Sequence, residues 1–323
     1  MMGLQTKMWL LVVLMFGILY GVITGIGTWM GAGSASTYII LAVLFMGFQY
    51  LVGPSMVSKI MRVKYVSEKE EPELHQMIEE LTEKAKIPKP KVGVSQLSIP
   101  NAFAFGRSLK DGRVCVTQGI QQILTKDELK GVLGHEISHL KHRDMMIITV
   151  LSVIPLIMYW IAFSMMWGGF GGRRQGGYAV LIGLGAMVLY FLTNLLVLYG
   201  SRIREYYADE RSVKLGNPPQ HLASALYKLV YSSARVRRDP RVQEEMKRVE
   251  GVKAFFLNDV SRAENEIREL QAVDRDLSGT IDQNELLALR SKTPKLSTAE
   301  KMMEIFTTHP NMLKRIKRLS TLV

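Results

Sequence analysis

Four long apolar blocks alternate with charged segments along this chain of 323 residues. About 20 consecutive apolar residues are enough for a helix to cross the hydrocarbon core of a bilayer. Each block holds 20 or more residues without a charged side chain, and the blocks are residues 8–31, 36–57, 145–170 and 176–200. The pattern therefore predicts four transmembrane helices, arranged as two tight hairpins.

The first block has an alternative interpretation as a cleaved signal peptide, because small residues follow it at 31–36. Signal peptides have apolar cores of roughly 7–15 residues after a basic start. This block is longer, and only Lys7 precedes it. We therefore expect a retained membrane helix.

The charged segments have the patterns of folded soluble structure. Residues 67–87 place apolar side chains on one helical face. Short runs of strand-forming residues with turn residues between them are 91–97, 101–106 and 112–118. A helix is expected to begin after Thr125, because Glu128 completes a capping box with it, and to run to about His142. Further helices are expected at 201–216 and 220–236.

These elements predict a mainly α-helical integral membrane protein whose soluble part contains a small β-sheet. The expected parts are a transmembrane hairpin (1–64), a soluble segment (65–144), a second transmembrane hairpin (145–200), and a second soluble segment (201–323) with an insert at about 262–292.

The distribution of basic residues predicts the orientation. The chain has 41 Lys and Arg against 29 Asp and Glu, a net charge of +12. The two hairpin loops contain only Arg173 and Arg174, so the other basic residues lie in the N-terminal tail, 58–144 and 201–323. The positive-inside rule places these parts in the cytoplasm, against anionic lipid headgroups. A single cysteine, Cys115, excludes an intrachain disulfide and fits a reducing compartment.

Nucleic acid is the other common partner of a basic protein. The sequence contains no basic patch interleaved with aromatic residues, which single-strand binding would require. We therefore expect a lipid bilayer as partner and no nucleic acid.

Two histidines and a glutamate in the helix after Thr125 have the spacing of a metallopeptidase site. His135 and His139 are four residues apart, so they share a helical face and can bind one ion. Glu136 is rotated by about 100° around the helix, where it can reach a metal-bound water as general base. A catalytic zinc site uses three protein ligands and one open position, so a third ligand is needed.

The third ligand is expected beyond the second hairpin. His142 is near in sequence, but one straight helix does not readily wrap three ligands around an ion, so we expect it to be solvated or to face lipid headgroups. Glu205 and Asp209 are four residues apart, and an antiparallel hairpin brings them level with His139. We expect Glu205 to bind the metal and Asp209 to accept the outer N–H of a ligating histidine. The alternative is that both carboxylates pair with neighbouring arginines.

The stretches "GHEISHLKHRD" (134–144) and "SRIREYYADERSVKLG" (201–216), separated by an apolar hairpin, resemble the HtpX-like membrane zinc metalloproteases, which are relatives of the CAAX prenyl proteases. The likeness extends to residues 100–106, 251–259 and 308–316.

The resemblance implies a thermolysin-like helical protease core carried on transmembrane helices, with its halves in 65–144 and 201–323. It also implies one zinc ion per chain. The zinc would be bound by His135, His139 and Glu205, with Glu136 as general base.

Two further positions gain a role from the resemblance. Residues 101–106 match the family's edge strand beside the active site, where a peptide substrate can add by β-augmentation, and Asn101 would help to hold that substrate. Taken alone, Asn101 is a common turn residue after a proline.

His309 lies in the family's His-Pro motif, where it could donate a hydrogen bond to the reaction oxyanion. The alternative is a helix start with Pro310 in the first turn. Asn311 stands where a second proline is commoner.

Residues 274–285 match the twelve-residue calcium loop of EF-hands. Gly279 stands at the sharp turn of the loop, and Ile281 supplies the apolar residue between its halves. The expected ligands are Asp274, Asp276, Ser278, Thr280 (through its carbonyl), Asp282 and Glu285. The loop is not part of the HtpX pattern, and we expect calcium to stiffen the segment that carries His309. The alternative is an acidic helix–turn–helix that binds no ion in the cell.

The sequence therefore predicts a multi-pass zinc endopeptidase of the cell membrane, with its active site on the cytoplasmic side. The resemblance alone implies membrane or misfolded proteins as its substrates. One alternative is a prenyl-protein processing protease. Another is a calcium-responsive membrane scaffold with an inactive protease core. The intact set of His135, Glu136, His139 and Glu205 disfavours the scaffold. No feature of the sequence fixes the oligomeric state.

Overall fold

The computed structural model describes residues 35–167, 176–236, 239–249, 273–291 and 298–323, together with residues 10, 14, 15, 18, 256, 257, 267, 270 and 271. The chain forms two compact units. One consists of Met1–Val52 and Met146–Ile203, and the other of Gly53–Met145 and Arg204–Val323.

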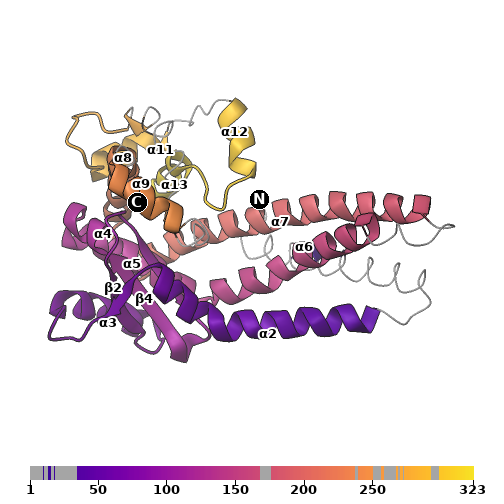
Figure 1. The fold of residues 1–323 in the computed structure, drawn as a ribbon. Helices are drawn as coiled ribbons and strands as arrows, with labels where there is room; N and C mark the ends of the chain where they lie inside the picture. Colours follow the sequence, from indigo (N-terminus) through magenta and orange to yellow (C-terminus); the bar gives the residue numbers. More distant parts are fainter. Residues whose placement is uncertain are drawn as a thin grey trace. The chain divides into compact units, whose positions relative to one another are not determined.

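Long apolar helices make up the first unit (Figure 1). Its described helices are α2 (Ala35–Ile60), α6 (Asp144–Trp167) and α7 (Gly176–Lys214), each with one end in the second unit. Leu151 packs in one apolar cluster with Leu196, whereas Met158 and Ala162 pack in another with Ala186. Helices α6 and α7 therefore run antiparallel, as expected of a hairpin.

The second, third and fourth apolar blocks are helical along their described lengths. The first block lies largely outside the described residues. Among the residues that the structure describes, one helical segment, Val180–Lys214, has the length and apolar composition of a membrane span. The prediction of four spans therefore stays a prediction.

A four-stranded mixed sheet lies in the second unit. Its strands are β1 (Val63–Tyr65), β2 (Lys91–Ser95), β3 (Ala102–Gly106) and β4 (Gly112–Thr117), in the order β1-β2-β4-β3. Strands β2 and β4 are parallel, and the other two pairs are antiparallel. The three predicted strands are confirmed. The short strand β1 was not predicted, because its three residues carry too little pattern to separate from the basic end of α2.

The second unit also contains most of the described helices. They are α3 (Pro72–Ala85), α4 (Gln118–Ile123), α5 (Lys126–Lys141), α8 (Pro219–Val236), α9 (Pro240–Arg248), α11 (Gln283–Arg290), α12 (Thr298–Ile305) and α13 (Met312–Leu319). Side chains of α3, α5, α8 and α13 share one apolar core with β2, β3 and β4. The helical face predicted for 67–87 is confirmed, since Leu74, Ile78 and Leu81 are fully buried in that core.

Helix α5 lies at the centre of the second unit, against β3, β4, α3 and α8. The predicted capping box at its start is confirmed, with Thr125 and Glu128 bonded reciprocally. Helix α8 holds the same end, because Ser224 Oγ and Lys228 Nζ donate to the Glu128 carboxylate at 2.6 and 2.8 Å.

Gly134 lets the end of α7 approach α5 closely, and Gly131 does the same for Leu222 of α8. Ser212 Oγ donates to the Gly131 carbonyl at 2.7 Å, and Asn217 Nδ2 donates to Ser212 Oγ at 3.1 Å. A Cβ at Gly134 would lie 2.2 Å from Asn217 Nδ2. The absence of side chains on this face of α5 therefore sets the distance at which α7 presents its polar residues.

Candidate metal centre

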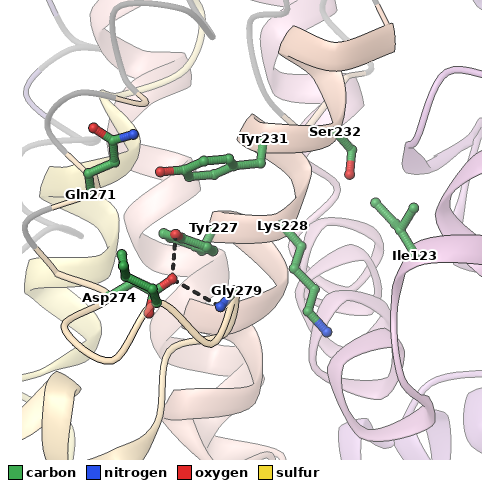
Figure 2. Close-up of a pocket in the computed structure, with 9 residues that line it drawn as sticks. Ile123, Tyr227, Lys228, Tyr231, Ser232, Gln271, Asp274 and Gly279 are labelled. Carbon is green, nitrogen blue, oxygen red and sulfur yellow. Dashed lines mark hydrogen bonds between the residues drawn. The ribbon is translucent and has the colours of Figure 1, made fainter.

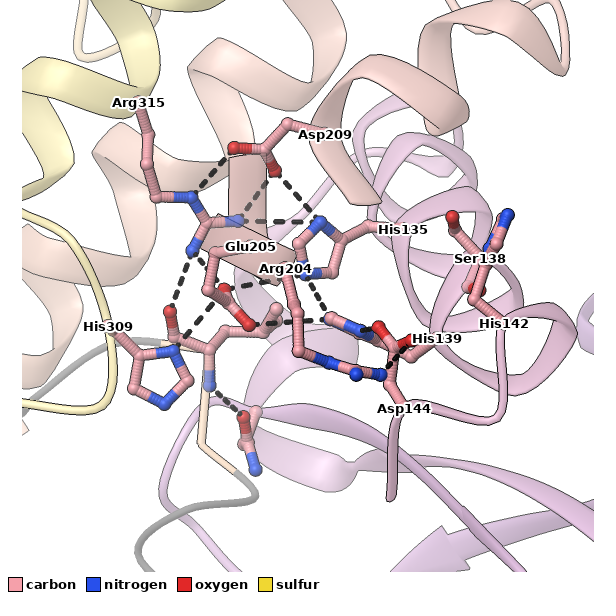
Figure 3. Close-up of polar contacts among 12 residues, drawn as sticks. His135, Ser138, His139, His142, Asp144, Arg204, Glu205, Asp209, His309 and Arg315 are labelled. Carbon is pink, nitrogen blue, oxygen red and sulfur yellow. Dashed lines mark hydrogen bonds and ion pairs between the residues drawn. The ribbon is translucent and has the colours of Figure 1, made fainter. Parts of the chain in front are cut away.

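Three side chains from two helices converge in the second unit: His135 and His139 from α5, and Glu205 from α7 (Figure 3). The two histidine Nε2 atoms are 3.0 Å apart. Glu205 Oε1 lies 3.3 Å from His139 Nε2, and Glu205 Oε2 lies 3.6 Å from His135 Nε2. The structure thus brings the three predicted ligands together.

These separations fit a tetrahedral zinc ion. Bonds of about 2.0–2.1 Å to nitrogen and oxygen place neighbouring tetrahedral ligands about 3.3 Å apart. The atoms that meet here are two imidazole nitrogens and a carboxylate oxygen, from residues that are buried or half-buried. This is a donor set that catalytic zinc takes in proteins, so the residues present fit the ion.

Each histidine is oriented by a carboxylate. Asp209 Oδ1 lies 2.8 Å from His135 Nδ1, and Asp144 Oδ2 lies 2.6 Å from His139 Nδ1. A carboxylate at Nδ1 fixes the tautomer that leaves Nε2 as the electron-pair donor. Asp209 therefore lies where the predicted role requires it. Asp144 was not predicted, although the acid directly before the third apolar block was a signal, since a charge there needs a partner.

Two arginines accompany these carboxylates. Arg315 from α13 is fully buried and pairs with both Asp209 and Glu205. Arg204 is also buried and pairs with Asp144. Burial works to lower the pKa of Arg315, but the carboxylates of Asp209 and Glu205 outweigh it and raise that pKa, so the guanidinium stays charged.

The predicted general base and oxyanion donor lie in the same buried region. Glu136 is buried, which raises the pKa of its carboxyl against the opposing effect of His139 and His135. His309 Nδ1 is 3.2 Å from Glu205 Oε2, and neither ring nitrogen of His309 has a hydrogen-bond partner. Glu136 and His309 therefore lie beside the three converging ligands.

Asn101 lies at the start of the sheet's edge strand and is fully buried. Its Oδ1 atom accepts a hydrogen bond from the backbone N–H of Leu257 at 2.9 Å. The Leu257 carbonyl in turn accepts from Arg315 NH1 at 3.1 Å. Asn101 is thus linked to the metal centre through one peptide unit, and this link is intramolecular.

His142 follows α5 as its C-cap and is half-buried, and it does not belong to the group of converging ligands, as expected. Its Nδ1 bonds the Ser138 carbonyl at 2.8 Å, and its ring packs edge-on against Tyr207. It makes no contact with the three ligands among the interactions described for it.

The EF-hand-like loop forms a second acidic cluster, in which carboxylate oxygens of Asp274, Asp276 and Glu285 lie within 4.8 Å of one another. Gly279 takes the left-handed conformation at φ +78° that the sharp turn requires. Helix α11 overlaps the end of the loop and follows it.

A cavity of about 370 Å³ adjoins this loop. Figure 2 shows Tyr227 and Tyr231 of α8 on one side of it and Asp274 on the other. The Tyr227 hydroxyl donates to Asp274 Oδ2 at 2.7 Å. Burial raises the pKa of Tyr227, so the phenol keeps the proton that it donates. The acidic loop is thereby joined to α8.

Two histidines four residues apart, a glutamate after the first, and a second glutamate from another helix are the arrangement of HExxH metallopeptidases. The sequence pattern described as peptidase family M48 matches residues 68–323. The chain belongs to this family, and its resemblance to HtpX-like proteases is confirmed.

The similar proteins include two archaeal relatives. The protease HtpX homolog of Methanothermobacter thermautotrophicus is 48% identical over 227 residues, covering 70% of this chain and 86% of that protein. The protease HtpX homolog 2 of Methanosarcina acetivorans is 36% identical over 292 residues, covering 89% of this chain and 85% of that protein.

Among solved structures, Ste24p of S. mikatae is similar with a TM-score of 0.53. The match covers 97% of this chain and 67% of that one, at 16% sequence identity. The two proteins therefore share a fold.

Proposed function

We propose that the protein is a zinc-dependent endopeptidase in which His135, His139 and Glu205 hold one zinc ion per chain. The observation that carries the proposal is the convergence of these three ligands, two buried and one half-buried, with a carboxylate at the outer nitrogen of each histidine. Zinc, when bound, supplies Lewis-acid activation of the scissile carbonyl and of the attacking water.

The remaining chemistry belongs to two side chains of this protein. Glu136 accepts a proton from the attacking water and gives it to the amine that leaves. His309 donates a hydrogen bond to the carbonyl oxygen as negative charge develops there. The ring of His309 suits this role because both of its nitrogens are buried without a hydrogen-bond partner.

The substrate in this proposal is a peptide chain in extended form. Strand β3 lies at an edge of the described sheet and packs against α5, so a peptide that adds to it lies near His135 and His139. Asn101 acts there by fixing the start of β3, since its amide oxygen is bonded to the Leu257 backbone.

We place this endopeptidase in the cell membrane, with several spans and its site on the cytoplasmic side, acting on membrane or misfolded proteins. The helical segment Val180–Lys214 and the basic residues outside the hairpin loops support this location. A prenyl-protein processing activity is the alternative, favoured by the fold of Ste24p. A scaffold with an inactive core is disfavoured by the complete ligand set.

The test uses purified full-length protein in detergent with a membrane-protein substrate. We expect Glu136→Gln to bind one zinc per chain and to lose cleavage, because the ligands remain while the base is gone. His139→Ala should lose zinc, whereas the matched control His75→Ala, on α3 away from the site, should keep both zinc and activity. Cleavage that persists in Glu136→Gln protein or in excess chelator contradicts the proposal.

Calcium binding by the loop at 274–285 is a second proposal. The grouping of three carboxylates around a left-handed Gly279 supports it. Asp274 and Glu285 already accept backbone N–H groups, from Ser278 and Gly279 and from Arg275 and Asp282 respectively. These bonds hold the acids of the loop close together, and Ser278, Thr280 and Asp282 complete the proposed ligand set.

A further inference from the structure

Arg315 is the most completely buried charged side chain near the metal centre, with no exposed surface. It lies in α13, whose start is capped by Asn311 through hydrogen bonds from the Leu313 and Lys314 backbones. Taking an arginine out of water is costly unless its charge and its N–H groups are all paired. The partners of Arg315 therefore indicate what its burial achieves.

The guanidinium makes a two-pronged contact with one carboxylate. Its Nε and NH2 groups donate to Asp209 Oδ2 and Oδ1 at 2.9 and 2.7 Å. Such a fork fixes the plane of the carboxylate as well as its position. Asp209 is the residue that contacts His135 Nδ1, so Arg315 sets the orientation of that imidazole through Asp209.

The third nitrogen faces the carboxylate ligand itself. Arg315 NH1 lies 2.9 Å from Glu205 Oε2, the same oxygen that His309 Nδ1 approaches at 3.2 Å. The other oxygen, Oε1, is the one near His139 Nε2. Figure 3 shows the guanidinium on one side of Glu205 and the histidine pair on the other. The two oxygens of Glu205 thus have different neighbours.

We propose that Arg315 is a positioning residue that occupies one oxygen of Glu205, so that Glu205 binds the metal through the other oxygen alone, while Asp209 and His135 are held in line. This rests on the proposed zinc-peptidase function and adds a reason why one coordination position stays open for water. Removing the guanidinium leaves only His309 beside Oε2, so that this oxygen can join Oε1 on the metal and displace that water.

If Arg315 had a purely structural role, its loss would have different effects on stability, on the metal and on kcat. Its NH1 group also donates to the Leu257 carbonyl, so losing it could loosen the segment around Leu257 without changing the metal. In that case stability falls, but the metal keeps its geometry and the folded fraction keeps its kcat.

The experiment compares Arg315→Met with Arg318→Met in the full-length protein. Arg318 lies one turn along from Arg315 on α13, is more exposed and pairs with Glu210, so it controls for the same substitution on the same helix. Cobalt replaces zinc as a spectroscopic probe, because its visible absorption weakens when the coordination number rises from four to five. Zinc content, kcat, KM and the melting temperature of the metal-free protein are measured alongside.

For Arg315→Met we expect one metal per chain, a weaker cobalt absorption, a kcat lower by about 10–100-fold, as for other residues that orient metal ligands, and a KM within about twofold. Arg318→Met should match the wild type. Arg315→Lys keeps a cation beside Glu205 but loses the two-pronged contact with Asp209, and it should retain the wild-type cobalt spectrum. This variant tests the proposal if Arg315→Met folds poorly.

An unchanged spectrum and kcat in folded Arg315→Met protein overturns the assignment, as does the same spectral change in Arg315→Lys. Wild-type protein that binds neither zinc nor cobalt contradicts the peptidase proposal instead. The two failures are therefore distinguishable.

Discussion

At the scale of single residues, buried charges in the second unit occur with partners that determine their geometry. Asp209 joins Arg315 to His135, Asp144 joins Arg204 to His139, and Glu128 joins α5 to α8. A buried charge that loses its partner costs far more than an exposed one. The polar residues of this unit therefore serve to fix positions at a cost that the apolar core must offset.

The contribution of a paired, buried charge to stability can be measured at Glu128, away from the metal centre. Burial works to raise the pKa of its carboxyl, but bonds from Lys228, Ser224 and the Thr125 backbone outweigh it and lower the pKa below the usual 4.5. A depressed pKa in the folded state contributes stability above the unfolded value, and this is lost as pH falls through the folded one. We expect Glu128→Gln to lower the free energy of unfolding by about 1–3 kcal/mol at pH 7.

The difference between wild type and Glu128→Gln should shrink as the pH falls from about 4.5, where the carboxyl of the unfolded chain takes up a proton, toward the lower pKa of the folded state. Thermal unfolding at several pH values measures it. Glu73→Gln, at an exposed ion pair with Lys126, is the control and should change little at any pH. A Glu128→Gln difference that is constant with pH would show that the charge is not what stabilises this end of α5.

The sequence predicted some of these residues and missed others for a physical reason. His135, Glu136 and His139 are local, since four residues along a helix define one face. Glu205 was found because a hairpin returns the chain to the same level. Arg315 was not found, since it is 106 residues from Asp209 and among several basic residues of 314–318, and the sequence does not say which of them is buried.

Asn311 shows the reverse case, in which the structure explains a departure from the family pattern. A proline at this position could not accept hydrogen bonds through its side chain. The Asn311 side chain accepts from the backbones of Leu313 and Lys314 and so caps α13. The substitution therefore helps to begin the helix that carries Arg315.

At the scale of elements, the site depends on how closely α7 approaches α5. Helix types and capping were predictable, because apolar periodicity and the Thr125–Glu128 pair are local signals. The close approach of α7 to α5 was not predictable, because nothing in "LKGVLGHE" indicates which helix its glycines will face. The structure shows Gly131 and Gly134 against Ser212, Asn217 and Leu222.

Gly134→Ala tests this approach. The added Cβ would meet Asn217 Nδ2 at 2.2 Å and Ser212 Oγ at 2.6 Å, so the end of α7 must shift. We expect a loss of about 1–3 kcal/mol in the free energy of unfolding and weaker zinc binding, because Glu205 is carried on the same helix. Melting curves and a zinc competition titration measure the two effects.

Gly185→Ala is the matched control for a helical glycine, since its added Cβ would have no atom within 4 Å. It should be neutral or slightly stabilising, as alanine is the better helix former. Equal zinc affinity in Gly134→Ala and Gly185→Ala protein would refute the view that Gly134 sets the position of Glu205.

At the scale of the whole molecule, the residues of the metal centre and the EF-hand-like loop all belong to the second unit, although α7 begins in the first. Two routes of direct contact join loop and centre. Asp274 accepts from Tyr227 of α8, and the next residue, Lys228, holds Glu128 of α5. Lys317 of α13 donates to the Leu289 carbonyl at the end of α11.

A calcium ion in the loop would therefore act on both helices that flank the metal ligands. We expect calcium to raise the activity of the zinc-loaded protein and to do so through Asp274. Asp274→Ala should lose calcium binding by titration calorimetry together with the activation. Gln283→Ala, an exposed loop position outside the proposed ligand set, is the control and should keep both. An unchanged calcium response in Asp274→Ala would separate the loop from the protease.

Tyr227→Phe isolates the route through α8, because it removes the hydroxyl that Asp274 accepts while leaving every proposed calcium ligand in place. If the signal passes along α8, this variant binds calcium about as tightly as the wild type but loses most of the activation. If it passes instead along α11 and α13, the activation survives Tyr227→Phe and is lost in Lys317→Met, whose side chain no longer reaches the Leu289 and Arg290 carbonyls. If calcium activation survives in both variants, neither of these two contacts carries the coupling.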